Sequence, residues 1–321
     1  MKPMQFLLAA CVALAAWTAQ AQSFPAQPIK WIVPFAAGGG TDNIARTLAE
    51  VIQQGLGAPV VIDNRPGAAT NVGVAALLHG KADGYTVMQA ENGALLFNEF
   101  LFAKLPYNPT KDFTYIGGIG RLPVALAVHP SLPVRTLADF VAYAKENSGK
   151  AHYASAGVGT PHHMAMELFK QQAGLDLVHI PYKGAAPALQ DLVGGQVKVM
   201  MVDLASSLQY IRAGKIHVVA IAANRRAQAL PDVPTFREGG YKDVDAYAFQ
   251  GLIGPAGMPA DVVAKLNAEL NKALAHPKVV ALFSNFGFEA MTGTPEEFRT
   301  AARDERMRWG RVIKTAGVQL E

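Results

Sequence analysis

The sequence predicts an α/β fold of two domains, and three observations lead to this prediction. From Pro25 onward, short apolar runs alternate with helical patterns, as they do where helices connect mostly parallel strands. The segment 127–247 contains a complete strand-helix series of its own. The apolar run 248–255 follows that series and is expected to return to the first domain, so the chain would cross between the domains twice and form a hinge.

The first domain is expected to comprise residues 22–126 and 248–321. Its strands are read from short apolar runs, and its helices from apolar residues that recur every three or four positions. We expect strands at 30–35, 60–63, 86–90, 115–117, 124–128 and 248–255, helices at 43–54 and 72–79, and a packed surface connection at 97–112. Further helices are expected after Pro259, Pro277 and Thr294.

The second domain is expected to comprise residues 127–247. Its strands are expected at 151–155, 178–182, 199–203 and 218–223, and its helices at 136–147, 162–172, 187–193 and 206–212. The helix at 136–147 begins with Thr136 and Asp139 at the spacing of a capping box, and Thr294 and Glu297 repeat this spacing near the end of the chain.

The first 21 residues have the pattern of a secretory signal peptide. They carry one positive charge at Lys2, an apolar run from Phe6 to Trp17, and Ala19-Gln20-Ala21 as a cleavage site. Cleavage after Ala21 would remove Cys11, the only cysteine, so the mature chain could form no disulfide. We therefore expect a periplasmic protein that is not inserted in the membrane after cleavage.

The mature chain is mildly basic. Without Lys2, 28 of the 29 lysines and arginines remain against 25 aspartates and glutamates, which gives a net charge of +3. This excess slightly favours anionic ligands. Because lysine and arginine do not occur in runs, a nucleic-acid groove is not expected.

Small-residue turns follow several of the expected strands, at Gly38–Gly40, 64–71 and 156–161. The carboxyl ends of parallel strands meet at one edge of a sheet, which is where open α/β sheets bind ligands. After Gly38–Gly40, Thr41 or Asp42 is expected to cap a helix whose first amides have no intrahelical partner. Such amides suit a carboxylate oxygen, although an ordinary glycine turn would give the same pattern.

Motifs of several enzyme classes are absent from the sequence. Ser155 is not in a Gly-x-Ser-x-Gly elbow, no Gly-Lys pair is followed by Ser or Thr, and Gly157-Val158-Gly159 lacks the third glycine of a dinucleotide fingerprint. His163 and Glu167 have a spacing that could hold zinc, but no third ligand is nearby. We expect no cofactor and no metal.

Two further sets of residues leave alternatives open. Asp42 and Asp203 could form an acid/base pair, or Asp42 could simply cap its helix, which we favour. Lys183 in Tyr182-Lys183-Gly184 could contact an anionic substrate or be a solvated turn residue, with neither interpretation preferred.

Over essentially the whole mature chain, the sequence resembles the Bug family, the extracytoplasmic solute receptors of tripartite tricarboxylate transporters. The motifs that carry the resemblance are 34–42, 64–68, 155–160 with His163, 181–184, 191–197, 230–235 and 249–259. The resemblance implies two α/β lobes of the type II periplasmic-binding kind that close on a small carboxylate, held by loop amides, hydroxyls and waters, without a catalytic residue. Ala69-Thr70 stands where two glycines are frequent, and Asp203 is shifted by one position from the usual acidic residue.

The expected ligand-binding residues come from the turns of both lobes and from neighbouring strand ends. They are Phe35, Ala37, Gly38, Gly39, Thr41, Asp42, Gly67, Ala68, Ala69, Thr70, Asn71, Asn92, Ser155, Gly157, Gly159, Thr160, His163, Tyr182 and Asp203.

The function expected from the resemblance is that of a monomeric receptor, which delivers a small carboxylate to the membrane subunits of a tripartite transporter. A secreted hydrolase or lyase that uses Asp42, His163 or Asp203 is the alternative from another class. A receptor coupled to a sensor kinase is a third interpretation.

Overall fold

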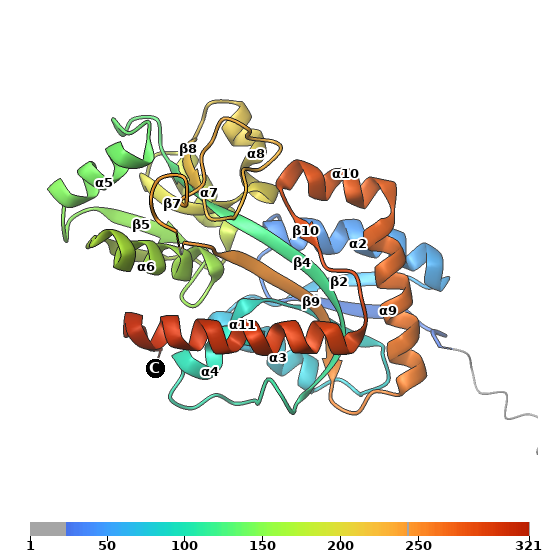
Figure 1. The fold of residues 1–321 in the computed structure, drawn as a ribbon. Helices are drawn as coiled ribbons and strands as arrows, with labels where there is room; N and C mark the ends of the chain where they lie inside the picture. Colours follow the sequence, from blue (N-terminus) through green and yellow to red (C-terminus); the bar gives the residue numbers. More distant parts are fainter. Residues whose placement is uncertain (1–23, 243, 321) are drawn as a thin grey trace, which may run out of the picture.

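The computed structural model describes residues 24–242 and 244–320, and within them the chain forms a curled sheet with helices on both sides (Figure 1). The α/β fold is therefore confirmed; the signal-peptide prediction concerns residues that lie outside those described. The strands are β1 (Ile29–Val33), β2 (Val60–Asn64), β3 (Thr86–Ala90), β4 (Phe113–Val128), β5 (His152–Ser155), β6 (Val178–Pro181), β7 (Val199–Asp203), β8 (His217–Ile221), β9 (Tyr247–Pro255) and β10 (Glu289–Ala290).

Two groups of parallel strands are joined by the long strand β4. The strand order is β2-β1-β3-β9-β4-β7-β5-β6, and β8 and β10 also pair with β4. Strands β1, β2 and β3 are parallel, as are β5, β6 and β7. From Phe113 to Pro123, β4 pairs with β9, whereas from Val124 to Val128 it pairs with β7 and β8. One strand thus takes part in both groups, as its diagonal course in Figure 1 shows.

The prediction of two separate strands at 115–117 and 124–128 is wrong. The glycines between them indicate a break in the sequence, but in the structure they lie at two register shifts of one continuous strand, at Tyr115/Gly117 and Gly118/Gly120. Gly120 has a φ of 150°, which few other residues adopt. Irregularities of this kind bend a strand and increase its twist without ending it.

Helices cover both faces of the sheet. They are α2 (Gly40–Leu56), α3 (Asn71–Leu78), α4 (Asn98–Leu101), α5 (Leu137–Glu146), α6 (Pro161–Ala173), α7 (Ala185–Val193), α8 (Leu204–Arg212), α9 (Ala260–Ala275), α10 (Pro277–Phe286) and α11 (Pro295–Ala316), with short helical turns at Ala68–Thr70 and Gly93–Phe97. The capping boxes of α5 and α11 are confirmed. Among the described residues, no helix is both long and apolar enough to cross a membrane.

Helix α2 begins earlier than predicted, and neither Thr41 nor Asp42 is its N-cap. Gly39 is the N-cap, with φ −77° and ψ 170°, and Gly38 makes the left-handed turn before it with φ 84°. Because the glycines themselves redirect the chain, Thr41 and Asp42 fall in the first helical turn. Within the described part of the chain, no side chain caps the start of α2.

The expected surface connection at 97–112 is also partly wrong. Phe97 and Leu101 are fully buried, and the Phe97 ring packs against Trp309 of α11 at a centroid distance of 5.0 Å. The last helix therefore covers this segment, a long-range contact that periodicity within 97–112 cannot indicate.

Candidate functional site

A small buried cavity lies between the two strand groups, where the first turn of α2 faces the ends of β5 and β7. It has a volume of about 20 Å³, room for roughly one water molecule. Its walls come from the first group (Phe35, Gly39, Gly40, Thr41, Glu91), the connecting strands (Leu122, Ala248) and the second group (Ala156, His162, Ala185, Asp203).

The first turn of α2 supplies backbone donors to this cavity. Gly39, Gly40 and Thr41 line it, and the first amides of a helix have no intrahelical acceptor. The Gly38 amide, which the sequence leads us to expect at the ligand, donates a hydrogen bond to Asp42 Oδ2 at 2.9 Å. Ala37 and Gly38 are exposed.

The Asp42 carboxylate is hydrogen-bonded to residues of its own strand group. Its carboxylate accepts hydrogen bonds from Arg46 and Asn64 as well as from Gly38. Burial acts to raise the pKa of Asp42, but these hydrogen bonds outweigh burial and lower it below its ordinary value. Asp42 therefore holds the glycine turn in place.

The two strand groups are in close contact beside the cavity. A Cβ atom built on Gly40 would lie 2.2 Å from Asp203 Oδ1 and 3.3 Å from the Ala205 methyl group. A Cβ on Gly39 would lie 3.8 Å from the Ala185 methyl group, which is an ordinary contact. Only glycine therefore fits at position 40 in this arrangement.

Three titratable side chains from different elements meet at the cavity. We call Glu91, His162 and Asp203 the Glu91 cluster. His162 Nε2 lies 3.4 Å from Asp203 Oδ2, and Asp203 also accepts hydrogen bonds from the amide and hydroxyl of Ser206 as the N-cap of α8. Burial acts to raise the pKa of Asp203, yet the contacts with His162 and Ser206 lower it.

Glu91 is a buried carboxyl group that sequence reasoning missed. Its Oε1 accepts hydrogen bonds from Thr41 Oγ1 at 2.7 Å and from Gln250 Nε2 at 3.1 Å. Burial raises its pKa to about 7, an effect that the Thr41 hydrogen bond opposes. Its position directly after the strand 86–90, at the same sheet edge as the glycine turn, is the signal that could have identified it.

Gly40 and His162 were not in the predicted set either. Gly40 belongs to the triple-glycine motif, and its position in the cavity follows from the early start of α2. His162 and His163 are consecutive on α6, about 100° apart around the helix. Sequence alone does not tell which one faces the cavity.

The second turn, 67–71, is strained and lies against Gly93, two residues after Glu91. Ala68, Ala69 and Thr70 have positive φ angles of 44°, 49° and 78°. Asn98, which was not predicted, donates to Ala69 O at 2.7 Å and to Asn71 Oδ1 at 2.9 Å. Thr70 Oγ1 is buried and has no hydrogen-bond partner among the residues that the structure describes. Gly67 introduces this turn with a φ of 129°.

In the third turn, the hydroxyl groups of Ser155 and Thr160 donate to Gly157 O at 3.0 and 2.7 Å, within their own loop. Ser155 Oγ also lies 2.6 Å from His179 Nε2 on β6, and Thr160 caps α6. The amide of Gly159 donates to His163 Nδ1 at 3.2 Å. Gly157, with a φ of 134°, lies against the carbonyl group of Tyr182.

His163 is a buried, neutral histidine in the first turn of α6, next to this loop. Its ring stacks on that of His179 at 4.0 Å, and burial lowers the pKa of His163 to about 4. Glu167 lies 4.0 Å from it, and the described residues include no group of three side chains that could hold a metal ion.

The remaining predicted side chains are bonded elsewhere. Asn92 donates to Tyr247 O at 3.1 Å and accepts from Phe249 N at 2.7 Å, which fastens the end of β3 to β9. The Tyr182 hydroxyl group donates to Asp191 Oδ2 at 2.6 Å. Of the predicted set, Phe35, Gly39, Thr41 and Asp203 line the cavity directly.

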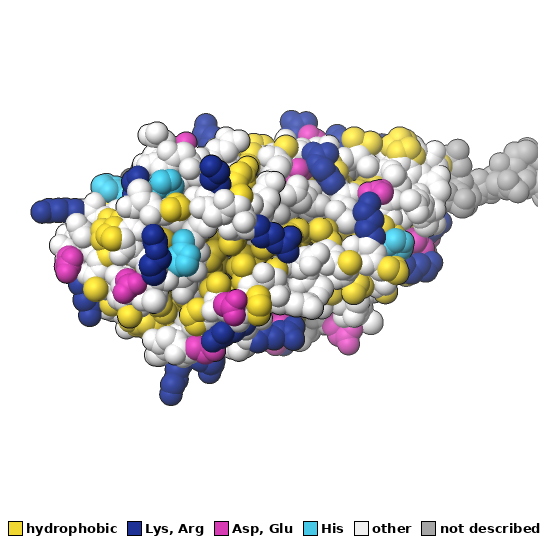
Figure 2. All heavy atoms as spheres, turned by 90° about the horizontal axis from the view of Figure 1, so that it is seen from above, with side chains coloured by type: hydrophobic (Ala, Val, Ile, Leu, Met, Phe, Trp, Pro, Cys, Tyr) yellow, Lys and Arg dark blue, Asp and Glu magenta, His cyan; other side chains and the backbone are white. Residues whose placement is uncertain are grey.

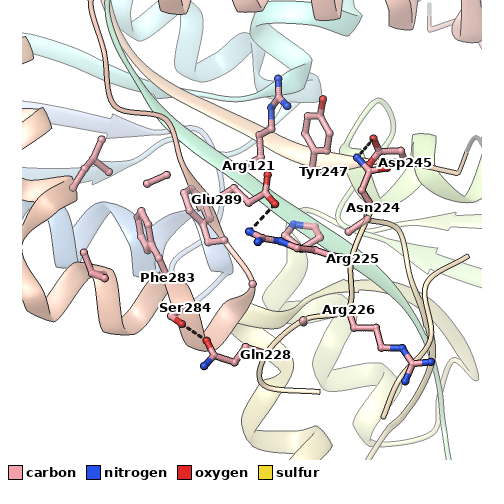
Figure 3. Close-up of a pocket in the computed structure, with 18 residues that line it drawn as sticks. Arg121, Asn224, Arg225, Arg226, Gln228, Asp245, Tyr247, Phe283, Ser284 and Glu289 are labelled. Carbon is pink, nitrogen blue, oxygen red and sulfur yellow. Dashed lines mark hydrogen bonds and ion pairs between the residues drawn. The ribbon is translucent and has the colours of Figure 1, made fainter. Parts of the chain in front are cut away.

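A second, larger cavity of about 430 Å³ lies between α10 and the segment after β8 (Figure 3). An ion pair between Arg225 and Glu289 at 3.0 Å and a hydrogen bond between Ser284 and Gln228 cross it. None of the predicted site residues lines it.

Figure 2 shows basic and acidic side chains interspersed on one face of the molecule, with hydrophobic side chains gathered along its middle.

The fold is that of a periplasmic solute-binding protein: it matches the solved structure of the periplasmic binding protein BugD with a TM-score of 0.89 and 33% identity, over 93% of this chain and 100% of that one. The sequence profile of the TctC family, the tripartite tricarboxylate transporter family receptor, matches residues 44–318. The chain belongs to this family, which confirms the resemblance described above, and the family consists of periplasmic receptors.

Relatives match over most of their length. Protein BugT of Bordetella pertussis is 34% identical over 302 residues, which are 94% of this chain and 93% of that protein. A solved structure from R. palustris with adipate is 32% identical, covers 92% of this chain and 98% of that one, and has a TM-score of 0.89. The structure of MatC from Rhodopseudomonas palustris with bound malate is 32% identical and has a TM-score of 0.85. The match covers 90% of this chain and 100% of that one.

Proposed function

We propose that this receptor captures a small carboxylate in the cavity and delivers it to the membrane subunits of a tripartite transporter. The observation that carries the proposal is the uncapped start of α2, which opens onto a buried cavity walled by both strand groups. Amides at the positive end of a helix dipole are suited to a carboxylate. The adipate and malate in the two related structures are small dicarboxylates, in agreement with this ligand class.

The two strand groups, in this proposal, are lobes that close on the ligand. Their boundaries are those expected from the sequence, 22–126 plus 248–321 for one lobe and 127–247 for the other. A ligand that contacts both lobes stabilises the closed arrangement in proportion to its differential affinity. The membrane partner would then recognise that arrangement on a monomeric receptor, exported through its signal peptide.

The proposed ligand contacts are centred on Gly39, Gly40 and Thr41. The cavity has room for about one water molecule, so the lobes must separate to admit a whole dicarboxylate. The strained turn at 67–71 and the turn at 155–160 flank the entrance in this proposal, and the Thr70 hydroxyl group, which has no hydrogen-bond partner among the described residues, would complete the site.

Gly39→Asp tests the amide site. Aspartate is a favoured N-cap, so its carboxylate would occupy the α2 amides itself and repel a ligand carboxylate. We expect the variant to be as stable as the wild type or more stable by a few tenths of a kcal/mol, and to lose binding.

Binding would be measured as a thermal shift with a panel of carboxylates, since a ligand at one hundred times its Kd adds about 2.7 kcal/mol. Gly39→Ala is the matched control, because its methyl group makes only ordinary contacts. Retained binding in Gly39→Asp, or equal loss in both variants, would contradict the amide site.

A further inference from the structure

A concave strip of the surface follows one face of helix α11, which crosses the front of the molecule in Figure 1 with α4 beside it. Two cavities, of about 300 and 590 Å³, follow each other along this helix. Arg299, Arg303 and Arg306 line the first cavity, and Gly310 and Lys314 line the second. Because these positions recur every three or four residues, they share one face of the helix. We call the two cavities together the α11 groove.

The α11 groove is basic. Among the described residues, five cations and one carboxylate, that of Glu296, line its two cavities. The cations are Arg299, Arg303, Arg306, Arg311 and Lys314. Glu99 and Asp304 pair with Arg306 and Arg303 from beside the cavities, which still leaves an excess of two positive charges. Since the whole mature chain has an excess of only three, much of its net charge lies in this groove.

These cations are accessible to another chain. The side chains of Arg299 and Arg303 are 61% and 58% exposed, and their ion pairs with Glu296 and Asp304 lie at the surface. Exposed ion pairs contribute little to stability because solvent screens them, so both arginines can exchange these carboxylates for those of a partner. No carboxylate is among the described residues that line the second cavity.

The second cavity also has an apolar wall that solvent reaches. Phe100 of α4 and Met307 of α11 line this cavity and are 39% and 52% exposed. The Phe100 ring lies over Gly310, where a Cβ atom would be 2.6 Å from it. Single exposed apolar side chains are common, but two that share one cavity form a pocket that suits an apolar side chain of another chain.

The α11 groove adjoins the contact between the two strand groups. Leu101, next to Phe100 in α4, packs against Gly159 of the second strand group, where a Cβ atom would be 2.6 Å from the leucine methyl group. Separation of the strand groups would break this contact. A chain that lies in the groove is therefore next to a contact that depends on closure.

We propose that the membrane subunits of the transporter dock in the α11 groove, through an acidic periplasmic segment that carries one large apolar side chain. The carboxylates of this segment pair with Arg299, Arg303 and Lys314, and its apolar side chain enters the second cavity beside Phe100 and Met307. An anionic lipid surface matches the charge of the groove, but a flat surface leaves its two cavities empty. This inference rests on the proposed delivery to a transporter and names the surface that delivery uses.

Proteoliposomes that contain the purified membrane subunits test the inference. Cosedimentation measures binding of the receptor, loaded with the carboxylate that gives the largest thermal shift, and liposomes of the same lipids without the subunits are run alongside. The double variant Arg303→Glu/Lys314→Glu should bind the proteoliposomes roughly tenfold more weakly or worse, because like charges then face each other across the interface. Lys150→Glu/Lys215→Glu is the matched control, since it changes the net charge equally at two exposed residues outside the groove, and it should bind like the wild type.

A second variant addresses the apolar pocket. Met307→Gln keeps the length of an exposed side chain and should weaken docking several-fold, because the pocket loses part of its apolar wall. None of the substituted residues lines the small cavity at the start of α2, so the thermal shift with carboxylates should be unchanged in every variant. The same measurement shows that each variant is folded.

The outcomes separate this inference from the proposed function. If the groove variants bind the proteoliposomes like the wild type, or if the matched control loses as much binding as the groove variant, the docking site is wrong and the carboxylate receptor stands. Equal binding of the wild type to liposomes with and without the subunits would replace the docking site by a lipid surface. If the wild type binds carboxylates but not the proteoliposomes, delivery to the transporter and the docking site are both overturned.

Discussion

Substitution of Gly40 by alanine should weaken ligand binding without unfolding the protein. The added methyl group would lie 2.2 Å from Asp203 Oδ1, well inside the separation at which a carbon and an oxygen are in contact. To relieve the overlap, the start of α2 and the end of β7 must separate by about 1 Å. These elements belong to opposite walls of the cavity, so the substitution acts against the closed arrangement.

The magnitude follows from the energy of overpacking. Inserting a methyl group into a tight contact costs about 1 to 3 kcal/mol, which corresponds to an affinity loss of roughly 5- to 150-fold. The fold itself should tolerate the change, because Gly40 is helical and alanine is the better helix former by up to about 1 kcal/mol. The melting temperature without ligand should therefore stay close to that of the wild type.

The assay is calorimetric titration with the acid that gives the largest thermal shift in the panel. Gly39→Ala, one residue earlier, adds the same methyl group where the nearest atom is 3.7 Å away, and should bind like the wild type. Equal affinities of Gly40→Ala, Gly39→Ala and the wild type would refute the reasoning that closure brings Gly40 against Asp203.

Three further predictions concern stability. Burial raises the pKa of Glu91 from its ordinary 4.5 to about 7, so the native state holds a proton that the unfolded chain releases. The free energy of unfolding should therefore fall as pH rises from 4.5 to 7, by up to about 3 kcal/mol, and urea titrations of Glu91→Gln should lack this fall; an identical pH profile in the variant would contradict the burial argument. Ala69→Gly should stabilise the protein by about 0.5 to 1 kcal/mol, since relief of a left-handed conformation exceeds the entropy cost of glycine; a lower urea midpoint than the wild type would show that the turn is not strained. Gly251→Ala should lower the free energy of unfolding by about 1 to 3 kcal/mol, because its Cβ would lie 1.9 Å from the Phe298 ring; an unchanged urea midpoint would mean that the ring moves freely.

The sequence allows most strands and helices to be predicted, because their signals are local. The capping boxes at Thr136 and Thr294 are examples, since a threonine and an acidic residue three positions later bond to each other's backbone. Of the predicted site, the triple-glycine turn lies at the cavity, and Asp203 faces it from the other strand group.

The features that could not be predicted depend on contacts between distant residues. The place of Glu91 in the site depends on its hydrogen bonds with Thr41 and Gln250, which lie 50 and 159 positions away from it in the sequence. Phe97 is buried by Trp309 of the last helix. The continuity of β4 likewise depends on β9, which stays paired with it past glycines that locally favour a break.

That continuity affects how the molecule can move. Because β4 runs unbroken from one strand group into the other and is paired with β9 on the way, the connection between the groups is a hydrogen-bonded strand and not a flexible loop. Separation of the two halves must deform hydrogen-bonded backbone, and the irregular positions near Gly118 and Gly120 are the most compliant parts of that backbone. The resistance of β4 to bending would return the two strand groups to one preferred separation after each opening.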